Sequence, residues 1–159
     1  MDSNKKRGRI TGILFLFIFP AIAFGQTEIE TEIETRTETE QIKKFISTDD
    51  LGAFLEFLEE GNDLDDCYEI NDAEYSLLVL SIKFNCKKIF KKCIELEADL
   101  DKSCIEKTPL IYAIKYQRER FFKKLIIAGA DKSIETPEGK TAMEYAKKYK
   151  RKEFISLLK

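Results

Sequence analysis

The sequence predicts an all-α fold in which about four helix-turn-helix units stack side by side, the last one truncated as a C-terminal cap. Three observations predict it. A segment recurs after 32 residues, each copy carries apolar residues at helical spacing, and turn residues separate the copies. Internal similarity at a period of about 20 to 50 residues is typical of stacked-repeat proteins.

The repeat is clearest between IKFNCKKIFKKCIELEAD (82–99) and IKYQRERFFKKLIIAGAD (114–131), which share Ile-Lys, Phe-Lys-Lys, a further Ile and a closing Ala-Asp. In the second copy Phe121, Phe122 and Leu125 fall on one side of a helix, and the two lysines between them face water. A short helix cannot bury such a side alone, so we expect each unit to pack against its neighbours.

The register of the repeat divides the chain into units of about 41–72, 73–104, 105–137 and 138–159. Gly61 and Gly129 are expected just past helix ends, where glycine adopts a left-handed conformation without a Cβ clash. Thr108-Pro109 is expected to begin a helix, with the hydroxyl as cap and the proline as first residue.

The first 25 residues have the composition of a secretory signal peptide. Four basic residues within positions 5–9 precede an apolar run, 10–24, and small residues at 21–25 suit cleavage after Ala23 or Gly25. A membrane anchor is the alternative, but about 20 apolar residues are needed to span a bilayer and Pro20 interrupts this shorter run. The sequence therefore predicts export to the periplasm or the exterior, with no membrane attachment after cleavage.

Residues 26–40 form a Thr/Glu-rich acidic linker, and TEIETEIETRTETE within it carries six Glu and one Arg. Like charges without a continuous apolar side favour a solvated spacer. The alternative is an extra strand or helix that forms on a partner.

The chain has no histidine, which excludes triad hydrolases and His-based metal sites. Adjacent acids such as Asp49 and Asp50, or Asp65 and Asp66, are expected at helix starts as caps rather than as catalytic groups. We therefore expect no enzyme activity, no cofactor and no metal.

The motifs TPLIYA (108–113), AGAD (128–131) and EGKTAMEYA (138–146) resemble those of ankyrin-repeat proteins, and the resemblance covers 41–159. It implies paired antiparallel helices, projecting loops between units, and a concave face that binds other proteins. The usual His after Thr-Pro-Leu is replaced by Ile111 in the third unit, and Gln117 stands at the mid-repeat turn where a Gly is usual.

The stacked arrangement brings Cys67 and Cys104, in successive inter-unit loops, close enough for a disulfide, which export would allow. Cys93 aligns with the core residue Leu125 and is expected to pack as a small apolar side chain.

A Lys-aromatic pair recurs in three successive units at positions that the resemblance assigns to the concave face. The candidate partner-binding residues are Lys83, Phe84, Lys115, Tyr116, Lys148 and Tyr149, flanked by the loop residues Ile105, Lys107, Glu138 and Lys140. Exposed rings would offer rigid contact area, and the lysines would attract an acidic partner. The alternative is that the rings pack under the neighbouring turn.

These observations predict an exported, non-enzymatic module that binds another protein. Residues 41–72 hold ten acids and two bases, whereas 73–159 hold twelve acids and twenty bases, so the basic part favours an acidic partner. Two alternatives stay open: a periplasmic immunity-type protein that neutralises a toxin, and a passive structural spacer. Nucleic-acid binding is not expected, because no recognised module accompanies the lysines.

Overall fold

The computed structural model describes residues 26–159, and the predicted signal peptide, 1–25, lies outside them. The described chain is mostly helical, which confirms the all-α prediction at the level of secondary structure. In chain order the elements are α1 (Gln26–Thr48), α2 (Leu51–Glu59), β1 (Tyr68–Glu69), β2 (Glu74–Tyr75), α3 (Leu77–Phe84), α4 (Lys87–Glu95), α5 (Pro109–Lys115), α6 (Glu119–Ala128), α7 (Ala142–Lys148) and α8 (Lys152–Leu158).

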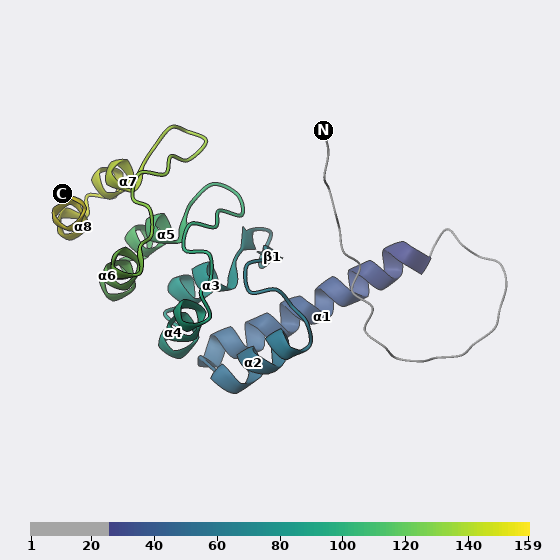
Figure 1. The fold of residues 1–159 in the computed structure, drawn as a ribbon. Helices are drawn as coiled ribbons and strands as arrows, with labels where there is room; N and C mark the ends of the chain where they lie inside the picture. Colours follow the sequence, from purple (N-terminus) through teal and green to yellow (C-terminus); the bar gives the residue numbers. More distant parts are fainter. Residues whose placement is uncertain (1–25) are drawn as a thin grey trace, which may run out of the picture.

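Consecutive helices pack in pairs, α1 with α2, α3 with α4, α5 with α6 and α7 with α8, and the pairs follow one another in a row (Figure 1). The first helices also pack on one another, α1 on α3, α3 on α5 and α5 on α7. Helix α3 lies in the middle of this packing, and all of its residues from Leu77 to Ile82 are buried. Each pair thus covers apolar surface of its neighbours.

The second helices bury the apolar side that the sequence predicts. Phe121, Phe122 and Leu125 of α6 are buried. The Phe121 ring stacks on Phe90 of α4 with centroids 4.4 Å apart, and the Phe122 ring meets Phe154 of α8 edge-on at 5.0 Å. Full burial of one such side chain stabilises the fold by about 1.5–3 kcal/mol, so these contacts hold successive pairs together.

The turn inside each helix pair has the same backbone geometry four times. Asp49, Asn85, Gln117 and Lys150 all have a left-handed φ, between 51° and 64°. In each case the next amide donates to a carbonyl five residues back, for example from Cys86 to Ser81 at 2.8 Å. The turn therefore persists without glycine, although a left-handed conformation costs most residues about 1–2 kcal/mol.

The second helices end where glycine was predicted. Gly129 is the left-handed C-cap of α6 with φ 100°, and Gly61 has φ 96° just past α2, which confirms both predictions. Just past the end of α4 the corresponding residue is Glu97, with φ 57°. That position has the same conformation without the glycine that favours it.

The repeated Ala-Asp of the sequence closes these turns and links one unit to the next. The Asp65 carboxylate accepts the backbone N–H of Asp99 at 2.9 Å, and Asp101 accepts that of Asp131 at 3.0 Å. Both bonds join residues about one repeat apart. The backbone N–H of the repeated Ala-Asp and the acid two residues beyond the corresponding position of the preceding unit therefore connect neighbouring units, a role the sequence analysis did not assign.

The start of α5 is only partly as predicted. Thr108 is the N-cap and Pro109 the first helical residue, but the Thr108 hydroxyl makes no capping hydrogen bond. In α7 the same position does cap, because Thr141 and Glu144 form a capping box. A glutamate three residues after the threonine supplies the second half of that motif.

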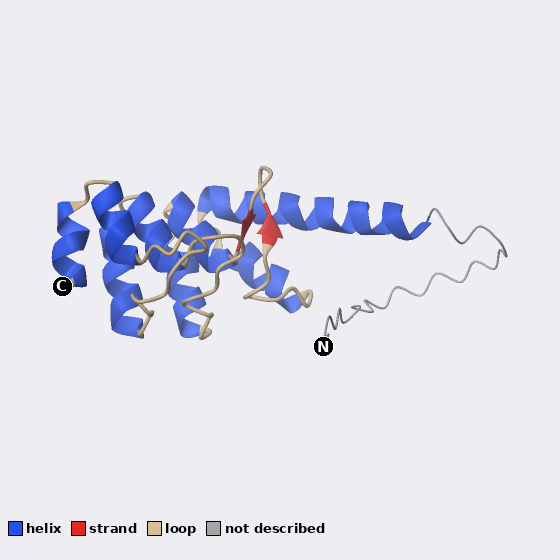
Figure 2. Ribbon diagram, turned by 90° about the horizontal axis from the view of Figure 1, so that it is seen from above, coloured by secondary structure: helices blue, strands red, loops and turns tan. Residues whose placement is uncertain are grey.

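The acidic segment 26–40, predicted as a spacer, is helical and continuous with the packed part of α1. No break lies at 40/41, and Figure 2 shows α1 extending beyond the other helices. Two contacts fix its inner part: the Thr39 hydroxyl donates to the Glu69 carbonyl at 3.2 Å, and the Gln41 amide to Glu60 at 3.0 Å. Adding residues to a formed helix is far easier than nucleating one, and Glu is a good helix former.

A short antiparallel hairpin, β1 with β2, precedes α3 and was not predicted. Asn71 and Asp72 form its tip with φ of 53° and 59°, and the Ile70 amide donates to the Ala73 carbonyl at 2.8 Å. Two successive left-handed residues match the twist of paired strands, and Asn and Asp tolerate this conformation. The Asn-Asp dipeptide was the available signal.

Candidate functional site

The last turns of α3, α5 and α7 place the three Lys-aromatic pairs. Lys83 and Phe84 end α3, whereas Tyr116 and Tyr149 are the C-caps of α5 and α7. Because these helices pack side by side, the pairs lie on the ends of neighbouring helices. The structure thus brings together the residues that the sequence singled out.

The two tyrosines of these pairs are half-buried, so their rings both pack and remain accessible. The Tyr116 ring is nearly parallel to that of Tyr112, one turn earlier, with centroids 6.1 Å apart. The Tyr149 ring lies 5.9 Å from that of Tyr145, which is buried. The sequence analysis missed Tyr112 and Tyr145. Each precedes a predicted tyrosine, Tyr116 or Tyr149, by four residues, a spacing that places both rings on the same side of a helix.

The hairpin adds one more ring to this surface. Tyr75, at the end of β2, meets Tyr112 edge-on with centroids 5.7 Å apart. Sequence reasoning could not find it, because its place depends on a strand that was not predicted. We call the surface the tyrosine–lysine row; it consists of Tyr75, Tyr112, Tyr116, Tyr145 and Tyr149 with Lys83, Lys115 and Lys148.

The lysines of the row lie close to the rings. The Lys83 ammonium lies 4.0 Å from the centroid of Tyr75, the Lys115 ammonium 5.4 Å from that of Tyr116, and the Lys148 ammonium 5.5 Å from that of Tyr145. Such contacts hold a cation in place without neutralising it. Within residues 26–159 none of these three lysines forms a salt bridge with a carboxylate. Lys140, and to a lesser extent the charge of Lys148, lowers the pKa of Glu138. The charges of Lys83 and Lys115 are therefore the most open to an anion.

The predicted loop residues behave differently. Lys107 pairs with Glu106, and Lys140 pairs with Glu138, so both loop lysines have a carboxylate partner. The Lys107 ammonium also lies 5.6 Å from the centroid of Tyr145. Ile105 is 53% exposed. The loops therefore supply compensated charges and one apolar side chain beside the row.

The hydroxyls of Tyr112 and Tyr116 stay protonated in neutral water. Burial raises the pKa of Tyr112 to about 12, with smaller contributions from Tyr75 and Tyr116. Burial also raises the pKa of Tyr116, helped by Tyr75 and Tyr149. Each effect of one hydroxyl on another reflects their proximity. Tyr112 and Tyr116 therefore present neutral phenols, able to donate and accept hydrogen bonds, next to positive charges.

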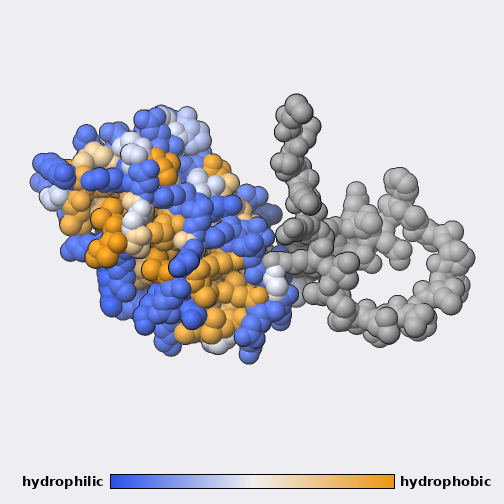
Figure 3. Space-filling model, in the orientation of Figure 1, coloured by the Kyte–Doolittle hydropathy of each residue, from blue (hydrophilic) through white to orange (hydrophobic). Residues whose placement is uncertain are grey.

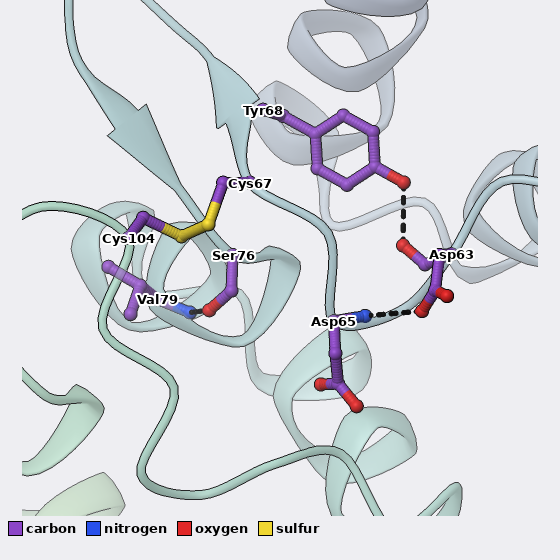
Figure 4. The surroundings of a disulfide bond; sticks show 7 residues. All are labelled: Asp63, Asp65, Cys67, Tyr68, Ser76, Val79 and Cys104. Carbon is purple, nitrogen blue, oxygen red and sulfur yellow. Dashed lines mark hydrogen bonds between the residues drawn. A yellow bond between two sulfur atoms is a disulfide. The ribbon is translucent and has the colours of Figure 1, made fainter. Parts of the chain in front are cut away.

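Cys67 and Cys104 form a disulfide that joins the loop before β1 to the loop before α5 (Figure 4). Their Cα atoms are 5.6 Å apart, within the ordinary range for such a bond. Cys93 is buried in the core, as predicted. Cys86 is also buried, and its thiol donates to the Ile46 carbonyl of α1 at 3.1 Å.

Two of the four candidate acids, Asp49 and Asp50, cap helices, whereas Asp65 and Asp66 lie in the loop between α2 and β1, so the prediction that they start a helix is wrong. Asp50 accepts the amides of Gly52 and Ala53 in its own unit, at 2.9 and 3.2 Å. Asp49 reaches the next unit and accepts the amides of Lys88 and Ile89 at 2.9 and 3.1 Å. Across residues 26–159 no three His, Cys, Asp or Glu side chains are grouped as a metal site would require.

Comparison with known proteins adds no relative: no family model and no curated protein matches the chain. None of the helices in the described part is both long and apolar enough to cross a bilayer.

Proposed function

We propose that the protein binds an acidic partner protein through the tyrosine–lysine row. One observation carries this proposal: three lysines at the ends of adjacent helices lie against tyrosine rings and have no carboxylate partner in the described chain. Rigid tyrosine rings are typical of binding hot spots. The open positive charges beside them would attract an acidic partner.

We further propose that the helix pairs form an ankyrin-type stack. Supporting features are the helix-hairpin turns repeated at Asp49, Asn85, Gln117 and Lys150, and the packing of first helices on one another. In such a stack the ends of the first helices and the loops between units line one face. The row would lie on that face.

Export is part of the proposal. The composition of residues 1–25 supports it, and so does the Cys67–Cys104 disulfide, because such bonds persist in oxidising compartments. A periplasmic or extracellular protein with this surface would meet its partner outside the cytoplasm.

Affinity capture tests the proposal with two variants of equal charge change. The first is Lys83→Gln/Lys115→Gln/Lys148→Gln, which removes the open charges of the row. The control is Lys87→Gln/Lys88→Gln/Lys152→Gln, at exposed lysines of α4 and α8. We expect the row variant to lose the partner and the control to retain it, with binding that weakens as salt rises. Equal retention by both would remove the row from consideration and favour a passive spacer.

A further inference from the structure

A groove of about 400 Å³ opens between α1, α3 and the hairpin. Its volume is within the ~300–1,000 Å³ range of ligand pockets. The apolar lining consists of Ile42, Ile46, Ile70, Leu80 and Phe84, and the polar lining of Lys43, Ser47 and Asn71. Figure 3 shows, on the face drawn there, that hydrophobic residues gather in patches between hydrophilic ones.

Phe84 connects this groove to the tyrosine–lysine row. Its ring lines the groove and is 44% exposed. The Lys83 ammonium lies 5.5 Å from the centroid of that ring. The first open charge of the row therefore stands at the edge of the groove, and the charges of Lys115 and Lys148 follow on the next two helices.

We propose that the groove takes one aliphatic or aromatic side chain of an acidic peptide segment whose carboxylates bind Lys83 and Lys115. The inference rests on the proposed function and adds the chemistry of the partner. An apolar anchor would cover the exposed part of Phe84, which gains free energy by leaving water. The open lysines identify the chain around that anchor as acidic, because they lack carboxylate partners within residues 26–159.

Charge also disfavours the hairpin side of the groove for an acidic segment. The hairpin beside the groove carries Glu69, Asp72 and Glu74, all exposed. An acidic segment is repelled from that side and attracted towards α5 and α7. The anchor therefore lies at the α1–α3 end, and the carboxylates lie over the row.

Two fluorescent peptides test the inference on the full chain. One is a short Glu/Ser peptide with a single Phe, and the other has Ser in place of that Phe. We expect the Phe peptide to bind about tenfold more tightly or better, as burial of one large apolar side chain implies. Lys83→Gln/Lys115→Gln, which removes both proposed carboxylate contacts, should weaken both peptides alike and leave their ratio unchanged.

The groove itself is tested by Ser47→Leu, which fills it from α1. The matched control is Ser156→Leu, another exposed helical serine whose hydroxyl bonds to a carbonyl of its own helix. Ser47→Leu should bring the ratio of the two affinities close to one while salt-dependent binding persists, and Ser156→Leu should leave the ratio intact. Phe84→Ser is a second groove variant with the same expected effect, should the leucine prevent folding.

The outcomes separate the inference from the proposed function. Equal binding of the two peptides, lost on removal of the lysines, overturns the groove inference and leaves the acidic partner standing. Binding that ignores both salt and the lysine variant overturns the two together, as does the failure of both peptides to bind. Self-association of the chain that Ser47→Leu abolishes assigns the groove to a second copy and contradicts the inference.

Discussion

The tyrosines of the row combine packing with exposure, each to a different degree. Tyr145 is 1% exposed and belongs to the core, whereas Tyr149, one turn later, is half-buried. The exposure of each ring thus shows how much of it packs on a neighbour and how much is left accessible. Of the three predicted rings, Phe84, Tyr116 and Tyr149, Phe84 is the most exposed.

Alanine substitutions should reveal this gradient. Tyr145→Ala should lower the free energy of unfolding by about 3–5 kcal/mol, as expected for a buried aromatic. Phe84→Ala should cost only about 1 kcal/mol, because part of its ring already contacts water. Urea denaturation of the two variants measures both values. Similar losses would show that Phe84 is core and unavailable to a partner.

The two free thiols should be nearly unreactive in the native protein. Burial, with a contribution from Asp49, raises the pKa of Cys86 to about 11, and burial raises that of Cys93 to about 12. At about pH 8 a thiol reagent should label neither residue rapidly, and two thiols should appear after unfolding in urea. Four thiols in the unfolded, unreduced protein would contradict the disulfide.

The raised pKa values of the two thiols should also make the free energy of unfolding fall as the pH rises above about 9. Both thiols have pKa values above the ordinary 9.0, so only the unfolded chain ionises just above that pH. The contribution of the two protonated thiols to the free energy of unfolding is complete below about pH 9 and is lost as the pH rises towards 11 and 12. Urea titrations of the wild type and of Cys93→Ala across this interval should show a shallower loss in the variant. An identical slope would show that Cys93 does not carry the effect.

At the scale of elements, two neighbouring aspartates stabilise different helices, one within its own unit and one in the next unit. Asp50 caps its own helix, and Asp49 caps α4 of the next unit. The sequence predicted that such acids are caps, but not that one would reach across. That step depends on how two helix pairs meet, which local patterns do not specify.

Asp49→Ala should therefore lower the free energy of unfolding by about 1–2 kcal/mol through loss of the α4 cap, and the left-handed φ at this position adds to the cost. Asp49→Gly keeps the backbone conformation favourable and isolates the cap. Asp50→Ala is the matched control, since it removes a cap within one unit. Hydrogen exchange should show faster opening of the first turn of α4 in the Asp49 variants only. Unchanged exchange there would contradict the inter-unit cap.

Helices with strong apolar spacing were predictable and the elements that depend on context were not. The buried side of α6 follows from Phe121, Phe122 and Leu125 because their period matches a helix. The helical conformation of residues 26–40 was not predicted, because this segment has no continuous apolar side of its own. The hairpin was missed because Tyr68–Glu69 and Glu74–Tyr75 are too short to show alternation.

Across the whole molecule, the disulfide and the hydrogen bonds to Asp49, Asp65 and Asp101 all join neighbouring units. Cys67 and Cys104 are 37 residues apart, so the bond closes a loop slightly longer than one repeat. The order of the repeats made this pairing predictable. The tyrosine–lysine row was predictable only in part, because the Lys-aromatic spacing is local whereas Tyr75 comes from the hairpin.

Removal of the disulfide should weaken the contact between the first two pairs. Cys67→Ser/Cys104→Ser should lower the free energy of unfolding by about 2–4 kcal/mol, the usual effect of opening a loop of this size. Denaturation of the oxidised wild type and of the variant measures the difference. No difference would show that the loops stay in place without the bond.

The central claim is that the tyrosine–lysine row contacts the partner, and site-specific photo-crosslinking tests it most directly. A benzoylphenylalanine replaces Tyr116 in the row, or Ile127, an 86% exposed apolar residue of α6 that serves as control. Illumination in cells that naturally produce the protein should give a covalent adduct from position 116 and none from position 127. An adduct from position 127 with none from position 116 would contradict the account.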